Sequence, residues 1–199
     1  MIYPGAYLQR VERHGGFGVF TSVPIPRGTV VWVRDALDQA LPPERVAALP
    51  AALQAEVARY AYTDARGDRV LCWDHARFMN HSCDPSATSV GTLMEIANRD
   101  LRPGAELTCE YGAAHVPERF DCACGSPHCR GGVVVDDLPA LWARWDRESA
   151  DALAWALTVD QPVLAAARPD DPGAWIVRAI LERRPVKLPS WAESVPGGA

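Results

Sequence analysis

The most informative stretch of this sequence is RFMNHSCDP at residues 77–85, and ELTCEYG follows it at residues 106–112. A generic loop has little need for asparagine, histidine, serine, cysteine and aspartate in that order. Asn80 and His81 offer hydrogen-bond donors and acceptors, and Tyr111 supplies a hydroxyl that stays un-ionised at neutral pH. The two stretches therefore indicate a site that carries chemistry.

Two further motifs lie on either side of these stretches. GFGVF at residues 16–20 contains Gly16 and Gly18, which a tight turn alone would also explain. Three of the six cysteines fall in the pattern C-x-C-x4-C at residues 122–129, followed by Arg130 and Gly131. This spacing is typical of metal ligands, and the chain is too long to need disulfides. We therefore expect reduced thiols that hold a metal.

Taken together and in this order, the four motifs resemble those of SET-domain protein lysine methyltransferases with a post-SET zinc motif, as in a small bacterial-type member. The likeness runs from about residue 6 to 135. It implies a mainly β fold with inserted and C-terminal helices, namely the SET-domain β-clip of short sheets with a pseudoknot and a zinc-binding post-SET loop. The expected organisation is a SET domain at 1–118 with a helical insert at about 40–63, the post-SET zinc loop at 119–135, and a C-terminal helical extension at 136–199.

The resemblance implies S-adenosylmethionine as the cofactor. Its pocket needs close backbone approach, amide-type hydrogen bonds and an aromatic wall. Glycines at 16 and 18 permit that approach, Arg77 can meet the carboxylate, and the family segment that contacts the cofactor corresponds to Asn80 and His81. For His81 an ordinary core histidine is the alternative. The predicted cofactor-binding residues are Gly16, Phe17, Gly18, Arg77, Asn80, His81 and Tyr111.

The implied reaction is an in-line displacement of the methyl group by a neutral amine. A free lysine, with a pKa of about 10.4, is almost fully protonated at neutral pH, so the site must favour the neutral form. A nearby sulfonium cation and a narrow, poorly hydrated channel both do so without a dedicated strong base. By its place in ELTCEYG, Tyr111 resembles the family's catalytic tyrosine, and a core tyrosine at a strand end is the alternative.

Departures from the family pattern fall on the substrate side. Many members have Phe or Tyr at the position of Cys109, a Glu-Tyr pair at Val33 and Arg34, and Asn at Ser86. The tyrosine of that pair helps to form the lysine channel. We therefore expect a channel that is wider or shaped by other aromatic residues. The predicted substrate-channel residues are Cys109, Tyr60 and Tyr62.

A structural zinc site needs four soft ligands in a tetrahedron. The C-x-C-x4-C pattern supplies three, and the resemblance implies that Cys83 completes the site. His128 is the rival fourth ligand, whereas Cys72 is expected to be a buried strand thiol. The predicted zinc ligands are Cys83, Cys122, Cys124 and Cys129.

Hydrophobic patterning predicts the elements around these motifs. Expected strands lie at residues 7–11, 19–23, 30–33, 69–73, 92–97 and 106–111, with a turn around glycines 15, 16 and 18. Expected helices lie at 42–62 with a break at Pro50, at 137–160, and at 171–184 with Asp171 as N-cap and Pro172 at N1. The tryptophan-rich C-terminal helices should pack on the domain or on a second subunit, which would give a homodimer.

Composition limits the partners. The 199 residues carry a net charge of −5 and a pI near 5.5, which argue against direct nucleic-acid binding and favour a basic partner. The sequence contains neither a secretion-signal pattern nor an apolar run long enough to cross a membrane, so we expect a cytoplasmic protein, and its arginine-rich composition suggests a bacterial source.

Three functional hypotheses follow. The first is an S-adenosylmethionine-dependent methyltransferase that modifies the ε-amine of a lysine in a protein or peptide. The second is a SET-fold enzyme that acts on a small amine or uses S-adenosylmethionine in another reaction, and the third is an inactive SET-fold binding module. Intact Asn80, His81 and Tyr111 disfavour the third hypothesis.

Overall fold

The computed structural model describes residues 1–113, 120–133 and 138–194. The expected domain boundaries at 118/119 and 135/136 lie outside the described residues. The strands are β1 (Ala6–Val11), β2 (Gly16–Thr21), β3 (Val30–Val33), β4 (Gln39–Leu41), β5 (Tyr62–Thr63), β6 (Arg69–Leu71), β7 (Asn80–His81), β8 (Ala87–Val90), β9 (Met94–Ala97), β10 (Glu106–Cys109), β11 (Phe120–Asp121) and β12 (Gly132–Val133). The α-helices are α1 (Pro43–Ala47), α2 (Ala51–Tyr60), α3 (Pro139–Ala156), α4 (Ala174–Leu181) and α5 (Trp191–Ser194).

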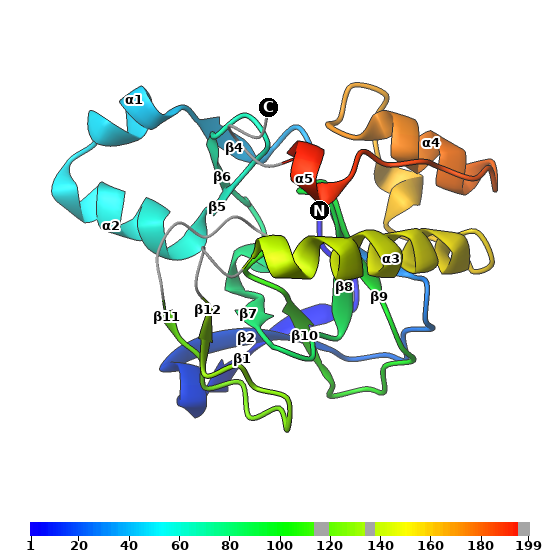
Figure 1. The fold of residues 1–199 in the computed structure, drawn as a ribbon, viewed down its shortest axis with the longest axis horizontal. Coiled ribbons are helices and arrows are strands. Elements are labelled where there is room, and N and C mark those ends of the chain that lie inside the picture. Colours follow the sequence, from blue (N-terminus) through cyan, green and yellow to red (C-terminus); the bar gives the residue numbers. More distant parts are fainter. Residues whose placement is uncertain (114–119, 134–137, 195–199) are drawn as a thin grey trace.

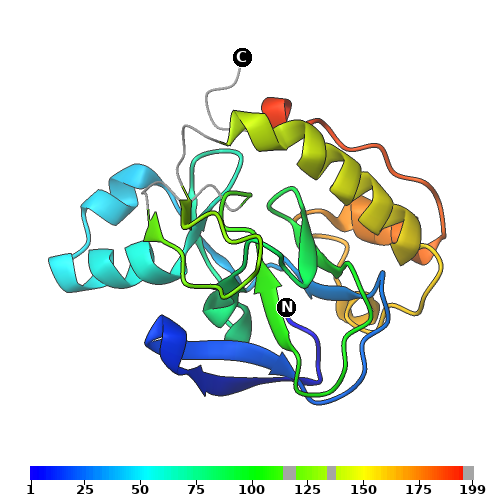
Figure 2. The same ribbon diagram turned by 60° about the horizontal axis from the view of Figure 1, so that its bottom comes forward.

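These short strands form several small sheets rather than one continuous sheet. The sheet orders are β1-β2-β10-β7, β3-β9-β8 and β4-β6-β5, and β11 pairs with β12. Helices α1 and α2 extend from one side of the strands, and α3 to α5 cover another (Figures 1 and 2). The expected mainly β fold with inserted and C-terminal helices is confirmed.

The N-terminal hairpin places the glycine-rich motif in a strand. Gly15 takes the left-handed conformation at φ 64°, which ends a short 3-10 turn and lets β2 begin at Gly16. β2 then pairs antiparallel with β1, with Gly18 opposite Gln9. The prediction of a turn at Gly16 and Gly18 is therefore wrong, because the chain reverses within residues 12–15 and β2 already includes both glycines.

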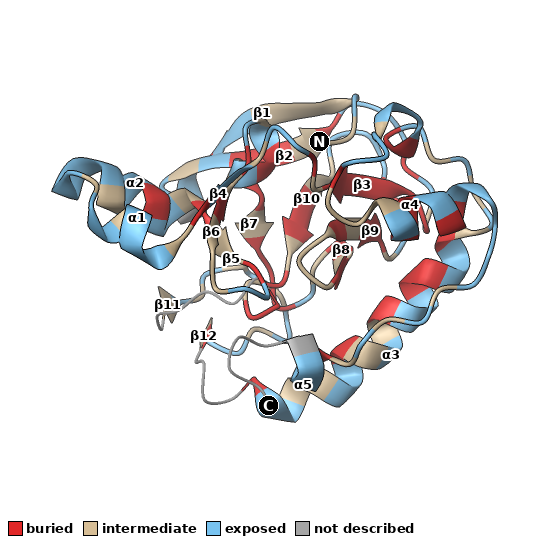
Figure 3. Cartoon of the chain, turned by 90° about the horizontal axis from the view of Figure 1, so that it is seen from above, coloured by how far each residue is buried: buried red, intermediate tan, exposed pale blue. Residues whose placement is uncertain are grey.

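The helical insert follows the break that the sequence predicts. Pro50 is the N-cap of α2 and separates it from α1, as the fixed φ of proline favours at a helix start. Most of both helices is exposed, whereas the central strands are largely buried (Figure 3). α2 contributes Val57 to a small core with Leu41 and Ala61.

The C-terminal extension shares a core with the strands, so it packs on the domain, which is one of the two arrangements expected for its helices. α3 lies across β8 and β9 (Figures 1 and 2). The shared core is formed by Val30, Val33, Val90, Met94, Ile96, Ala152, Leu153, Ala156, Val163, Leu164, Ile176, Val177 and Ile180. Gln161 adds polar contacts, since its side chain accepts from the Val30 amide and donates to the Gly28 carbonyl, both at 2.8 Å.

The predicted cap of the last long helix is wrong. α4 begins at Ala174 after Gly173, whose φ is 79°, and no side chain caps it. Asp171 instead accepts hydrogen bonds from the backbone amides of Ala36 and Arg168, so it joins two loops. Among the described residues, no helix combines the length and apolar character needed to cross a bilayer.

Candidate active site and zinc centre

The two signature stretches meet where β7 pairs with β10, and this pairing is called the β7–β10 crossing. β7 pairs in parallel with β10, with Asn80 opposite Thr108 and His81 opposite Cys109. The Ser82 amide extends this pairing by donating to the Cys109 carbonyl at 3.1 Å. Two segments separated by more than twenty residues are thus held side by side.

Ser86, a departure from the family pattern, fastens this crossing. Its hydroxyl donates to the Glu106 carbonyl at 3.0 Å and accepts from the Thr108 amide at 2.9 Å. The Ser86 amide donates to the Thr108 hydroxyl, also at 2.9 Å. Because these groups are buried, the hydrogen bonds avoid the cost of desolvated, unpaired polar atoms. The substitution therefore keeps a structural role at the crossing.

On one side of the crossing, Asn80 meets the glycine-rich strand. Its side-chain nitrogen donates to Glu106 Oε1 at 2.8 Å and to the Phe17 carbonyl at 3.2 Å. A Cβ at Gly18 would lie 2.5 Å from the same Glu106 oxygen and 2.9 Å from Asn80 Nδ2. Glycine at position 18 is thus required by the packing of Asn80 and Glu106 against the strand. Phe17 leaves 51% of its surface exposed and contacts Phe78 edge to face.

His81 links the predicted catalytic tyrosine to the cysteine cluster. The Tyr111 amide donates to His81 Nδ1 at 3.2 Å, so Nε2 carries the proton of the neutral ring. That Nε2 lies 3.3 Å from Cys83 Sγ, toward which it can donate. The ring is buried, at 4% exposure. His81 therefore has polar contacts on both nitrogens, as a buried histidine needs, so its role in cofactor binding stays a prediction.

Tyr111 is fixed by its hydroxyl and by its ring. The hydroxyl donates to the Met79 carbonyl at 2.8 Å, and the ring lies 5.5 Å from those of His81 and Phe120. Burial raises the pKa of Tyr111 above its usual value, with charge on Cys109 adding to the effect, so the hydroxyl keeps its proton at neutral pH. Phe120, which comes from β11, was not predicted as a site residue.

A cavity of about 130 Å³ lies beside Tyr111. The predicted residues Arg77, Tyr60, Tyr62 and Cys109 all line it together with Tyr111. Trp32 also lines it, and it precedes the positions where the family has its Glu-Tyr pair. Arg34 is not in this lining and forms an ion pair with Asp64 at 2.9 Å. Sequence reasoning missed the further lining residues Trp32, Met79, Ser89 and Glu95.

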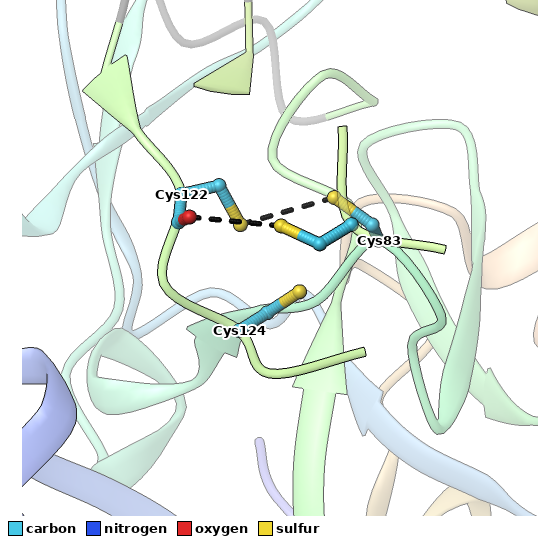
Figure 4. Close-up of side chains that lie close together, drawn as sticks. Cys83, Cys122 and Cys124 are labelled. Atoms are coloured by element: carbon cyan, nitrogen blue, oxygen red, sulfur yellow. Dashed lines mark hydrogen bonds between the residues drawn. The ribbon is translucent and has the colours of Figure 1, made fainter. Parts of the chain in front are cut away.

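The structure brings the four predicted zinc ligands together. The Sγ atoms of Cys83, Cys122, Cys124 and Cys129 all lie within 4.8 Å of one another. Three of these residues are labelled in Figure 4, where the dashed line between Cys83 and Cys122 marks a sulfur separation of 3.8 Å. A tetrahedral site with Zn–S bonds of about 2.3 Å needs sulfur atoms about 3.8 Å apart.

Among these sulfur atoms, the surroundings favour the thiolate at Cys124, whereas burial raises the pKa values of Cys83 and Cys122. Burial works to raise the pKa of Cys124, but hydrogen bonds from the backbone at Cys83 and Ser126 lower it to about 6. The Arg130 amide points to Cys83 Sγ at 3.4 Å. The rival ligand, His128, is exposed and does not belong to the cluster. Cys72 is buried in the core near β6, as expected.

An ion pair ties the cysteine loop to the second signature stretch. Arg130 donates to both carboxylate oxygens of Glu110, at 2.8 and 2.7 Å. The Gly112 amide donates to the same carboxylate at 2.9 Å. Because Glu110 is buried, the ion pair, in which one Arg130 nitrogen (Nη2) donates to both carboxylate oxygens, compensates for its lost hydration. The loop and the residues around Tyr111 are therefore held as one unit.

Comparison with known proteins identifies the region of the crossing. Residues 16–112 match the family model described as "SET domain". Histone-lysine N-methyltransferase TRX1 of Oryza sativa subsp. japonica is 39% identical over 72 residues, which are 33% of this chain and 7% of that protein. Histone-lysine N-methyltransferase ash1 of Drosophila melanogaster is 25% identical over 167 residues, which are 68% of this chain and 7% of that protein.

Solved structures show weaker similarity. The crystal structure of KRYPTONITE in complex with mCHH DNA, H3(1-15) peptide and SAH has 21% sequence identity and a TM-score of 0.45. The matched region covers 65% of this chain and 29% of the KRYPTONITE chain. The chain spans only 7% of the length of the curated relatives above.

Proposed function

We propose, from the premise that residues 16–112 of this chain are a SET domain, that the protein transfers a methyl group from S-adenosylmethionine to the ε-amine of a lysine in another protein. One observation carries the proposal. The Tyr111 hydroxyl is fixed on the Met79 carbonyl, and its ring borders the narrow cavity beside the β7–β10 crossing. A hydroxyl so positioned can orient a reacting amine.

The residues around the crossing suit S-adenosylmethionine, which supplies an activated methyl group on a sulfonium. Phe17 and Phe120 provide aromatic surface for an adenine, and Asn80 provides a polar group in the same region. Both ring nitrogens of His81 already have partners in the protein, so its contact with the cofactor stays a prediction. The two Nδ2 hydrogen bonds of Asn80 stay within the protein, so its Oδ1 is the amide atom that would face the cofactor. Contacts from Gly16, Gly18 and Arg77 to the cofactor stay predictions.

A structural zinc ion on the four cysteines would fix the loop that follows the SET domain. This loop carries Phe120, which packs on His81 and Tyr111, and Arg130, which pairs with Glu110. The metal would therefore hold an aromatic wall of the active site in place. Its role is structural, since four cysteines leave no open coordination position.

A basic protein substrate is supported by a second, larger groove. It has a volume of about 880 Å³, and Gly91 and Thr92 line both this groove and the cavity beside Tyr111. Its lining has more carboxylates than basic groups: Asp64, Asp68, Asp146, Asp170 and Glu193 against Arg34, Arg66 and Lys187. A lysine-containing basic segment could thus lie in the groove and insert one side chain into the cavity.

A small amine remains the second candidate, because the cavity itself accepts an amine without any peptide contact. Mass spectrometry of reactions with labelled S-adenosylmethionine separates the two candidates, with a histone H3 peptide, ribosomal proteins and a set of small amines as acceptors. Labelled lysine in a peptide supports our proposal. A labelled small amine with unlabelled peptides overturns it, and cofactor binding without any product indicates an inactive binding module. Cytoplasmic location, the absence of direct nucleic-acid contact and a homodimer stay predictions.

A further inference from the structure

The cavity beside Tyr111 holds one acid, the half-buried Glu95, that the proposed reaction has not yet used. Glu95 lies on β9, opposite Trp32 of β3 and Ser89 of β8. All three side chains line the cavity. A charged residue in the middle strand of a small, largely buried sheet is unusual, because removing a carboxylate from water is costly unless it is paired.

Among the described residues, only one of the two Glu95 oxygens has a hydrogen-bond partner. Oε1 accepts a hydrogen bond from the Ser89 hydroxyl at 2.6 Å. Oε2 is shielded from solvent and has no hydrogen-bond partner among the described residues. The indole nitrogen of the neighbouring Trp32 is likewise buried without a partner in that part of the chain. Two polar atoms on paired residues that line the cavity are thus left for a ligand.

The other charges of the cavity lie at its outer edge. Arg59 and Arg77 are exposed, and their guanidinium groups lie over the rings of Tyr60 and Phe78. Glu95 is the one acid among the described lining residues. Most of the remaining wall is aromatic or aliphatic, so a cation that enters the cavity meets a single acid, whose ionisation it favours.

We propose that Glu95 receives the cationic amine of the substrate and accepts the proton that the amine must lose before methyl transfer. This inference rests on the proposed function for its transfer step. As the ammonium enters the cavity, the protonated Glu95 carboxyl first releases its own proton to solvent. An N–H bond of the ammonium then breaks and its proton moves to Glu95 Oε2. The freed electron pair forms the N–C bond to the methyl group while the methyl–sulfonium bond breaks and its electrons stay on sulfur. Glu95 returns the proton to solvent after product release.

The acidity of Glu95 suits this task. Burial raises its pKa to about 8, the Ser89 hydrogen bond opposes the rise, and the charge of Glu110 adds to it. A pKa between those of an ordinary carboxyl and a lysine ammonium makes the carboxylate a better matched proton acceptor. Burial also raises the pKa values of the ionisable neighbours in the cavity above their usual values; these are Tyr62, Cys72, Cys109 and Tyr111. None of these four ionises near pH 8.

The binding test uses n-butylamine, which reproduces the lysine side chain beyond its α-carbon, and n-butanol as an uncharged probe of the same length. Both are titrated into the protein and into Glu95→Gln by saturation-transfer NMR at pH 7. Glu95→Gln keeps the shape of the side chain and an oxygen for Ser89. We expect it to weaken butylamine binding about tenfold or more, with little effect on butanol. The control is Glu56→Gln, an equal charge change on exposed α2.

Two results overturn the proposal: the natural protein does not bind butylamine, or Glu95→Gln binds it with unchanged affinity. A second measurement needs no variant: the infrared signal of a protonated carboxyl at pH 7 should disappear when butylamine is added, and a persistent signal contradicts the proposal. Neither measurement needs the cofactor. A protein that binds butylamine through Glu95 but not S-adenosylmethionine would therefore refute the proposed function alone.

The transfer test follows the pH profile of kcat/KM on a peptide acceptor. With Glu95 present, the rate should rise to a plateau near pH 8. In Glu95→Gln it should be lower at pH 7 and keep rising toward the pKa of the free lysine, about 10.4. A merely structural role would lower the rate at all pH values without changing the shape of the profile, and that result would overturn the assignment.

Discussion

Replacing Tyr111 by phenylalanine separates a catalytic tyrosine from a structural one. The variant loses the hydroxyl that donates to the Met79 carbonyl at 2.8 Å, and it keeps the ring contacts with His81 and Phe120. One lost hydrogen bond costs about 1 kcal/mol of the free energy of unfolding, or about 2–4 °C in Tm for a chain of this size. The fold and the affinity for cofactor should therefore persist.

The rate should fall much further than the stability. Because the hydroxyl proton is committed to Met79, the oxygen lone pairs are free to accept from the reacting groups in the cavity. Loss of such a contact in the transition state costs about 2.7–4 kcal/mol, which is about a hundred- to a thousandfold in rate.

The assay is single-turnover transfer of labelled methyl, beside calorimetric titration of cofactor and a melting curve. Tyr7→Phe, which removes the same atom from the β1–β2 hairpin, is the matched control. Transfer by Tyr111→Phe at the unmodified rate, with Tm lowered as expected, would refute the catalytic role of the hydroxyl.

Three further outcomes follow from the site. Metal analysis should find one equivalent of zinc, and chelation should lower Tm, because zinc that binds only the folded state adds to its stability. The control variant Cys72→Ser should keep the metal. A native protein without metal would contradict the assignment of the four cysteines as zinc ligands. Arg130→Gln should lower the free energy of unfolding in urea by about 1–3 kcal/mol, since the Glu110 side chain is buried and that of Arg130 is 30% exposed. A second change in the same protein, Glu110→Gln, should recover part of this loss. An unchanged unfolding midpoint in Arg130→Gln would show that the ion pair is not formed in solution. Gly18→Ala should lower cofactor affinity about tenfold, because its Cβ would displace the Glu106 carboxylate from Asn80; equal affinity would show that this arrangement does not shape the pocket.

The sequence predicted the parts of the site that depend on local motifs. Spacing alone indicated three metal ligands, and the resemblance supplied Cys83 from a distant segment, which the structure places within the same cluster. Tyr60 and Tyr62 were expected near the substrate channel, and both line the cavity beside Tyr111. The cysteines could be placed because their motif keeps them at fixed positions in one loop, whereas the role of Tyr60 and Tyr62 in a substrate channel stays a prediction.

What the sequence missed depends on tertiary pairing. Glu95 occupies a strand position that alternation assigns to a partly exposed face, and only the pairing of β3, β9 and β8 sets it beside Trp32 and Ser89. Asp171 precedes a proline in the pattern of a helix cap, yet contact with the Ala36 amide redirects its carboxylate. No local pattern encodes these long-range partners.

The most direct test of the central claim is to follow one labelled methyl group from S-adenosylmethionine to its acceptor. The purified protein is mixed with labelled cofactor and a histone H3 peptide, and tandem mass spectrometry locates the label. Lys187 is the one lysine of this chain, so modification of the protein's own lysine is easily distinguished from that of the peptide. We predict label on a lysine ε-nitrogen of the peptide, with an equal amount of S-adenosylhomocysteine formed. Cofactor bound but no label on any lysine of peptide or protein acceptors would contradict it.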